Sequence, residues 1–510
     1  MRFKMLGGVV AAALWLGTTP ATAEWRVYEA RHFQIYSESG EAKASELAAR
    51  LERYDKLMRM ATGIPDDNPA KVRVFEVAST DDIERALGVT DSGIAGFYSS
   101  NSFGPFLLTP RRIEYGGDRY FTPLLVLQHE YAHHFMLQYF PATYPSWYVE
   151  GFAELIGSSA MEKDGRILYG APAKQRGNEL TTYWIPLQEL LVKDEVKDFD
   201  NYGQGWAITQ YLTMDPARAK QLRTYLALLN AGKSNKDAAT QAFGDLARLN
   251  ADIRGHVQSG SWTVRPVKPE IALPVLTGSR ALRPAEVALL PEMVAFDDDP
   301  LSAIKDNGER EKQAKRRRAL LARIKDKAAT FPNDPHALAL LAEAAAVIDD
   351  KAEVDRVTRQ ALAIDPGNVK ALVRRSLFLS DQAKGLAGPA RTAKAAEARA
   401  LAVQANRADP DDALPLFAFY QSFNLVGQPP SPAAITGLES AVATLPDIDE
   451  MRLVLVEEYA RAKRWRAAMT ALAPLANSPH DSPQRKSARE RMAQLVAAAG
   501  GGASARSPAT

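Results

Sequence analysis

The 510-residue sequence contains no cysteine, which excludes disulfide bonds, thiol chemistry and lipid attachment to a cysteine. It also has no apolar run of the ~20 residues that a membrane-spanning helix needs. The 63 basic and 61 acidic residues nearly cancel, so no general attraction to nucleic acid or to an acidic membrane is expected. The basic run KQAKRRR at 312–318 is best explained as a solvated helix face.

The first 23 residues have the pattern of a secretory signal peptide. Arg2 and Lys4 give a positive start, residues 5–17 are apolar, and small residues at 21–23 precede Glu24. We expect residues 1–23 to be removed, which leaves no stable membrane anchor; an uncleaved anchor is the alternative. The alanine-rich composition and the absence of cysteine favour a periplasmic or secreted bacterial protein.

Composition divides the rest of the chain into regions. Residues 24–262 are rich in aromatics and mix strand patterns such as KVRVFEV with helical ones. Residues 263–300 hold six prolines and the run DDD, a composition typical of a connector. Residues 301–499 are rich in Ala, Leu and Arg and show helical patterns alone, and residues 500–510 are expected to be a flexible tail.

The helical region repeats a short phrase in which an alanine precedes a proline by five residues. The three pairs are Ala361/Pro366, Ala405/Pro410 and Ala441/Pro446. Counted from Pro335, the proline spacings are 31, 44 and 36 residues. Because proline cannot continue a helix, each marks the junction of two helices. This period resembles degenerate tetratricopeptide repeats, which implies an all-α stack that offers a surface to a protein partner; an irregular helical bundle is the alternative.

One apolar segment stands out because it contains three histidines and a glutamate: LLVLQHEYAHHFMLQYF at 124–140. Thr122 is suited to cap a helix and Pro123 to begin one. Pro141 is suited to end it. The sequence therefore predicts a helix from about Pro123 to Tyr139.

Two of these histidines, His129 and His133, are four residues apart and so lie on one face of the helix. HEYAH is the HExxH arrangement of zinc hydrolases. In it both imidazoles can bind one zinc ion, and Glu130 can act as the base for a zinc-bound water. A structural histidine pair is the alternative. His134 points ~100° away from His133 and should not reach the same ion.

A third ligand follows after a short turn. WYVEGFAEL at 147–155 predicts a second helix, and 16 residues separate Glu150 from His133. Two antiparallel helices can therefore bring Glu150 against both histidines, and two histidines with one glutamate form a known catalytic zinc set. Glu154 lies on the same face and is expected to accept a hydrogen bond from His129; an exposed helix glutamate is the alternative.

The combination HEYAH…WYVEGFAE resembles the gluzincin metallopeptidases, in particular the aminopeptidase N family and the small bacterial peptidase-MA-like domains. The resemblance covers most of residues 24–262 and implies a zincin-like fold with Glu150 as the third zinc ligand. NYGQGWAITQYL at 201–212 resembles the Y-x-x-G stretch of the aminopeptidase N family. This implies that Tyr202 stabilises the oxyanion, with Tyr183 and Tyr211 as competing candidates and a tyrosine packed in the core as the alternative. No run resembles the GAMEN motif, so aminopeptidase specificity is not implied.

Taken together, these patterns predict an α+β zincin-like metallopeptidase domain followed by an all-α tetratricopeptide-like domain. The expected activity is hydrolysis of peptide bonds in a peptide or protein substrate by a water that zinc and Glu130 activate. Two alternatives remain open. One is a catalytically idle peptidase domain in a repeat-based assembly protein, and the other is a zinc site that hydrolyses another amide or an ester.

Overall fold

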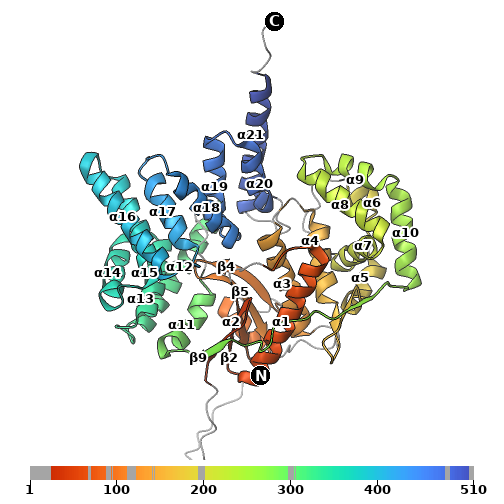
Figure 1. The fold of residues 1–510 in the computed structure, drawn as a ribbon, viewed down its shortest axis with the longest axis horizontal. Helices are drawn as coiled ribbons and strands as arrows, with labels where there is room; N and C mark the ends of the chain where they lie inside the picture. Colours follow the sequence, from red (N-terminus) through yellow and green to blue (C-terminus); the bar gives the residue numbers. More distant parts are fainter. Residues whose placement is uncertain are drawn as a thin grey trace, which may run out of the picture.

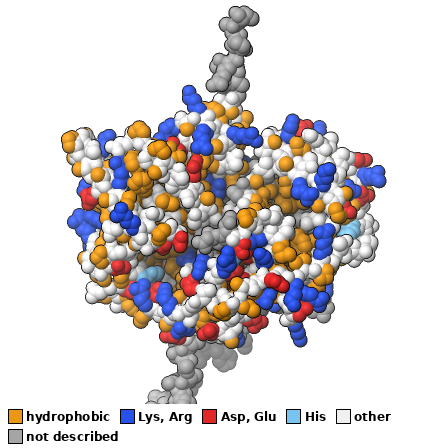
Figure 2. Space-filling model, in the orientation of Figure 1, with side chains coloured by type: hydrophobic (Ala, Val, Ile, Leu, Met, Phe, Trp, Pro, Cys, Tyr) orange, Lys and Arg blue, Asp and Glu red, His pale blue; other side chains and the backbone are white. Residues whose placement is uncertain are grey.

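The computed structural model describes residues 24–66, 71–87, 94, 96–111, 122–140, 142, 144–192, 201–296, 304, 306–476 and 483–504. The expected signal peptide, residues 1–23, lies outside the described residues. No helix within the described ranges is long and apolar enough to cross a membrane. Figure 1 shows a central sheet flanked by one helical lobe on the right and a longer stack of helices on the left. Side chains of both charge signs are scattered over the face seen in Figure 2, in keeping with the formal net charge of +2.

The main sheet is mixed and has six strands in the order β4-β5-β3-β2-β1-β9. Strands β2, β3 and β5 run parallel, whereas β1, β4 and β9 pair antiparallel with their neighbours. Their bounds are β1 (Arg26–Glu29), β2 (Phe33–Ser37), β3 (Val72–Val77), β4 (Phe97–Asn101), β5 (Gly104–Pro110) and β9 (Gly278–Ala281). A second, three-stranded sheet has the order β6-β7-β8, with β6 (Ala160–Met161), β7 (Ile167–Tyr169) and β8 (Arg265–Val267).

Among the described residues of the first half, ten helices surround the sheet and form the right-hand lobe (Figure 1). They are α1 (Glu41–Thr62), α2 (Thr80–Leu87), α3 (Pro123–Tyr139), α4 (Ser146–Gly157), α5 (Gly177–Thr182), α6 (Leu187–Leu190), α7 (Tyr202–Met214), α8 (Pro216–Asn230), α9 (Asn235–Phe243) and α10 (Leu246–Ser259). The expected helix with three histidines is α3, and the Thr122 hydroxyl caps it by accepting a hydrogen bond from the Leu125 N–H at 3.2 Å.

Both faces of the inner strands β3 and β5 are buried, which explains why these strands carry apolar residues at successive positions. Val74 and Leu107 face a core that includes residues of α1 and α3. Phe75 and Leu108, the next residues along each strand, face a core built largely by the second half of the chain. Successive side chains of a strand point to opposite faces, so the helical region covers the face that α1 and α3 leave open.

The segment 263–300 is not merely the connector that its prolines predict. It contributes strand β8, edge strand β9 beside β1, and helix α11 (Pro284–Val294). Proline is tolerated here for positional reasons: Pro284 occupies the first helical position and Pro266 lies on an edge strand, where a missing N–H breaks no ladder bond. The connector prediction is therefore corrected, because much of this segment belongs to the folded domain.

A region of consecutive helices, called here the repeat region, follows. Its helices are α12 (Asn307–Ala328), α13 (Pro335–Val347), α14 (Lys351–Ile364), α15 (Val369–Lys384), α16 (Gly388–Ala408), α17 (Leu414–Asn424), α18 (Pro432–Thr444), α19 (Asp449–Arg461), α20 (Trp465–Ala476) and α21 (Pro483–Ser504). Each packs against the next, and α13 and α17 also pack on α15. As the spacing predicted, Pro366, Pro410 and Pro446 lie in the turns between helix pairs. The last helix continues to Ser504, into the segment expected to be a tail.

The repeat region also contacts the first half of the chain by polar bonds. The Tyr98 hydroxyl on β4 donates to the Asp447 carboxylate in the turn before α19. The Gln138 amide at the end of α3 donates to the Ala443 carbonyl at 2.7 Å. Lys370 on α15 donates to the Ser102 carbonyl at 3.0 Å. These three bonds connect the repeat region to the β4 edge of the main sheet and to the end of α3.

A buried ionic network joins the start of β2 to α1. His32 is 3% exposed, and its Nδ1 lies 2.6 Å from Glu52 Oε2 while its Nε2 lies 3.1 Å from Asp66 Oδ1. Asp55 accepts a hydrogen bond from the Tyr131 hydroxyl at 2.7 Å, which extends the network to α3. Burial lowers the pKa of His32, but the hydrogen bond to Glu52 and the charge of Asp55 outweigh it, so the net pKa is raised.

This raised pKa makes stability depend on pH. Histidine in an unfolded chain titrates near ~6.5, so the contribution of protonated His32 is fully present below that pH and is lost as the pH rises through the higher folded pKa. We expect His32→Gln to lower the free energy of unfolding more at about pH 6 than at about pH 9. Urea unfolding of both proteins at both pH values measures this; an equal loss at both would contradict the assignment.

Candidate metal centre

Helices α3 and α4 bring the three predicted ligands together. His129, His133 and Glu150 each offer one ligand atom, and these atoms lie within 4.8 Å of one another. The two histidine Nε2 atoms are 3.1 Å apart, and Glu150 Oε2 lies 3.4 Å from the first and 3.5 Å from the second. Ligands at 2.0–2.1 Å from a tetrahedral zinc are ~3.4 Å from each other. The spacing therefore suits a small cation.

The surroundings of Glu150 also suit a cation. Its side chain is 2% exposed, yet its Oε2 accepts no hydrogen bond within the described part of the chain. A buried carboxylate oxygen without a partner is costly, and a metal ion at the centre of the cluster would satisfy it. This group is the one set of three metal-ligating side chains at such spacing among the described residues. The cluster can hold a metal ion, and its geometry alone does not identify which.

The pKa values of the ligands point the same way. Burial lowers the pKa of His129, but its contacts with Glu150 and Glu154 raise it to about 10. Burial raises the pKa of Glu150, but His133 and His129 hold it well below its usual range. The site thus stabilises positive charge on the imidazole. Protons and metal ions bind to the same nitrogen atoms. The carboxylates of Glu150 and Glu154, which favour a proton on His129, therefore also favour a metal ion.

Glu154 lies next to His129, although the Nδ1 atom of His129 forms no hydrogen bond within the described residues. Its Oε1 lies 3.3 Å from His129 Nδ1, the ring nitrogen that faces away from the cluster. Glu154 is fully buried and accepts hydrogen bonds from Gln175 Nε2 at 2.9 Å and from Arg176 Nε and Nη2 at 3.0 and 2.6 Å. Burial raises the pKa of Glu154, but His129 and Arg176 lower it to about 2. The alternative of an exposed glutamate is therefore wrong.

Sequence reasoning missed Gln175 and Arg176. They lie on a short 3-10 helix, Lys174–Arg176, more than twenty residues beyond Glu154. No motif marks them. The one indirect signal was Glu154 itself, because a carboxylate buried beside a candidate metal ligand needs hydrogen-bond donors to hold it in place.

Tyr202 is the first residue of α7, and its ring centroid lies 6.1 Å from that of His129. The Arg176 guanidinium lies over the ring at 4.5 Å. Burial and the charge of Glu150 raise the pKa of Tyr202 to about 12, so its hydroxyl stays protonated. The competing candidates are placed elsewhere: Tyr183 is 61% exposed, and Tyr211 packs against His256.

Glu130 and His134 lie on α3 but are not among the three convergent ligands. Glu130 is half-buried, and its charge helps to raise the pKa of both Tyr98 and Tyr202. His134 does not join the cluster, as expected. Its Nδ1 lies 2.9 Å from the Tyr98 hydroxyl, and burial lowers the pKa of His134 to about 3.

No protein-family model matches this chain, and no curated protein matches it. Among solved structures, the chain is similar to a thermophilic tetratricopeptide repeat protein of Thermus thermophilus. The sequences are 22% identical with a TM-score of 0.32, over 37% of this chain and 95% of that chain. Because this similarity is low, the pairing of helices described above rests on the contacts within this chain.

Proposed function

We propose that this chain is a zinc-dependent metallopeptidase of the gluzincin type, with a zincin-like arrangement around α3 and α4. The observation that carries the proposal is the convergence of His129, His133 and Glu150 within 4.8 Å, with Glu130 next to the first ligand. Three protein ligands leave one position of a tetrahedral ion for water. When bound, zinc lowers the pKa of that water toward ~7 and polarises a carbonyl.

The other residues have roles that follow from their positions. Glu130 would take a proton from the attacking water and pass it to the leaving amine. The Tyr202 hydroxyl, kept protonated by its raised pKa, would donate a hydrogen bond to the oxyanion. Glu154 would hold the Nδ1–H of His129, so that Nε2 faces the cluster.

Peptides are the proposed substrates because HEYAH and WYVEGFAE resemble peptidase sequences. Two alternatives are to be tested. Either the site hydrolyses another amide or an ester, or it is catalytically idle and the chain is a repeat-based assembly protein. The signal-peptide pattern of residues 1–23 supports a periplasmic or secreted location as part of the same proposal.

The test combines metal analysis with peptide cleavage. We expect the purified full chain to hold about one zinc per molecule, measured by inductively coupled plasma mass spectrometry. A diverse peptide library, analysed by mass spectrometry, should be cleaved, and cleavage should stop on chelation and return with added zinc. A zinc-loaded chain that cleaves no peptide would favour the assembly alternative, whereas a chain that binds no zinc would overturn the proposed metallopeptidase.

A further inference from the structure

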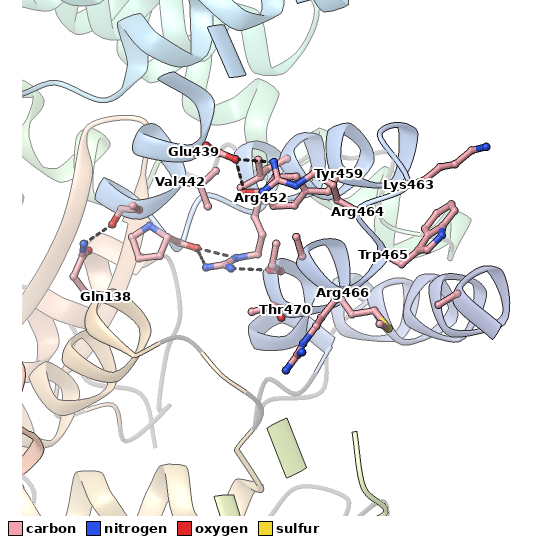
Figure 3. Close-up of a pocket in the computed structure, with 17 residues that line it drawn as sticks. Gln138, Glu439, Val442, Arg452, Tyr459, Lys463, Arg464, Trp465, Arg466 and Thr470 are labelled. Atoms are coloured by element: carbon pink, nitrogen blue, oxygen red, sulfur yellow. Dashed lines mark hydrogen bonds and ion pairs between the residues drawn. The ribbon is translucent and has the colours of Figure 1, made fainter. Parts of the chain in front are cut away.

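A groove of about 1080 Å³ lies where the last repeats meet the domain that contains the metal-ligand cluster (Figure 3). Helices α18, α19 and α20 form most of it, and Gln138 of α3 borders one end. Gln138 lies five residues beyond His133, which is ~8 Å along the helix axis. The groove is as large as typical ligand pockets, which reach ~1,000 Å³, and it begins close to the metal ligands.

The buried side chain of Arg452 forms the floor of the groove. Arg452 is 4% exposed, and its guanidinium donates to the Pro446 carbonyl at 3.1 and 2.5 Å and to the Ala471 carbonyl at 2.8 Å. These bonds, drawn in Figure 3, tie the turn before α19 to α20. No carboxylate accepts these three bonds, but the charges of Asp447 and Asp449 act on the guanidinium.

Large side chains that remain accessible line the walls. Trp465, Tyr459 and Met469 are all half-buried and border the groove together with Val442 and Leu455. Tryptophan, tyrosine, methionine and arginine are the residues enriched where proteins bind partners. An accessible apolar lining of this kind favours an occupant that brings its own apolar side chain.

The charged residues of the lining favour a negative occupant. Arg452, Lys463, Arg464 and Arg466 face a single acidic residue, Glu439. Arg464 forms an ion pair with Glu439 at 3.2 Å. Figure 3 shows Lys463 extending away from the groove, whereas Arg466 is exposed beside it. Positive charge therefore remains at the rim, where Arg466 is exposed.

We infer that this groove binds an acidic polypeptide segment that carries an aromatic or long aliphatic side chain. The apolar side chain would contact Trp465 and Met469, and the carboxylates would lie toward Arg466. A segment held here would keep its protein next to the C-terminal end of α3. The inference goes beyond the proposed function, because this binding requires neither zinc nor cleavage.

Fluorescence anisotropy on the full-length Glu130→Gln protein tests the inference. Two short labelled peptides share leucine and phenylalanine positions and differ in charge, one with glutamate and the other with lysine between them. We expect the acidic peptide to bind at least about tenfold more tightly, and its binding to weaken as salt screens the charges. Equal binding of both peptides would overturn the inference.

Three variants test whether the acidic peptide binds in this groove. Trp465→Ala should weaken binding of the acidic peptide by about tenfold or more. Arg466→Glu changes an exposed side chain, so this variant should fold normally. The difference in affinity between the acidic and the lysine-containing peptide should become smaller. Arg318→Glu, an exposed charge reversal on α12, is the matched control and should change nothing. If Trp465→Ala and Arg466→Glu both bind as the control does, or if light scattering shows a dimer that Arg466→Glu abolishes, the inference fails.

Discussion

Replacing Glu130 with glutamine is expected to slow peptide cleavage by about a thousandfold and to leave zinc affinity nearly unchanged. Glutamine keeps the shape of glutamate but cannot take a proton from water, and a positioned general base contributes ~10²–10⁴ in rate. Glu130 is not among the three residues whose ligand atoms converge, so the ion should remain. Cleavage of a library-derived peptide gives kcat/KM, and competition with a chromophoric chelator gives the zinc Kd.

Glu150→Gln is the matched control, because it makes the same chemical change on the facing helix. Glu150 supplies the buried oxygen of the cluster, and a neutral amide binds zinc less well than a carboxylate. This variant should therefore lose zinc affinity, whereas Glu130→Gln should not. Cleavage that survives Glu130→Gln would defeat the proposed mechanism, even if zinc is bound.

The cluster of three candidate metal ligands was predictable because local rules fix most of it. Helix periodicity alone places His129 and His133 on one face, and capping by Thr122 sets where that helix begins. A short turn then limits where Glu150 can lie. The observed convergence of these three residues follows from spacing that is visible in the sequence. The helix pairs were predictable for a similar reason, since prolines mark their junctions.

Contacts between distant segments were not predictable in this way. Strand β9 pairs with β1 across some 250 residues, with Arg26 opposite Ala281, and no local pattern encodes that partner. The same is true of Arg176 against Glu154 and of Tyr98 against Asp447. The contact between Tyr98 and Asp447 depends on how whole layers pack, because the repeat region covers the second face of the sheet. The prolines of residues 263–300 therefore predicted a connector, although Pro266 lies on an edge strand and Pro284 begins a helix.

Replacing Gly151 with alanine is expected to disrupt the contact between α4 and α7. A Cβ at this position would lie 2.2 Å from Thr209 Oγ1 and 2.3 Å from the Gly205 carbonyl oxygen. That oxygen belongs to the backbone of α7 and cannot move unless the helix moves. Overpacking of this kind costs ~1–3 kcal/mol, occasionally more. We expect a loss of about 3 kcal/mol in the free energy of unfolding, measured by urea denaturation.

The effect should extend to the site, because Gly151 directly follows Glu150 and α7 begins at Tyr202. A shift of α4 against α7 would move Glu150 relative to the histidines, so zinc affinity should fall together with stability. Gly255→Ala on α10 is the control, since a Cβ there would meet no heavy atom within 4 Å. Alanine favours a helix over glycine by up to ~1 kcal/mol, so this variant should gain stability and keep its zinc affinity. Replacing glycine with alanine should therefore lower the free energy of unfolding at position 151 and raise it at position 255. If the Gly151→Ala protein is as stable as the Gly255→Ala protein, α4 and α7 are not in such close contact.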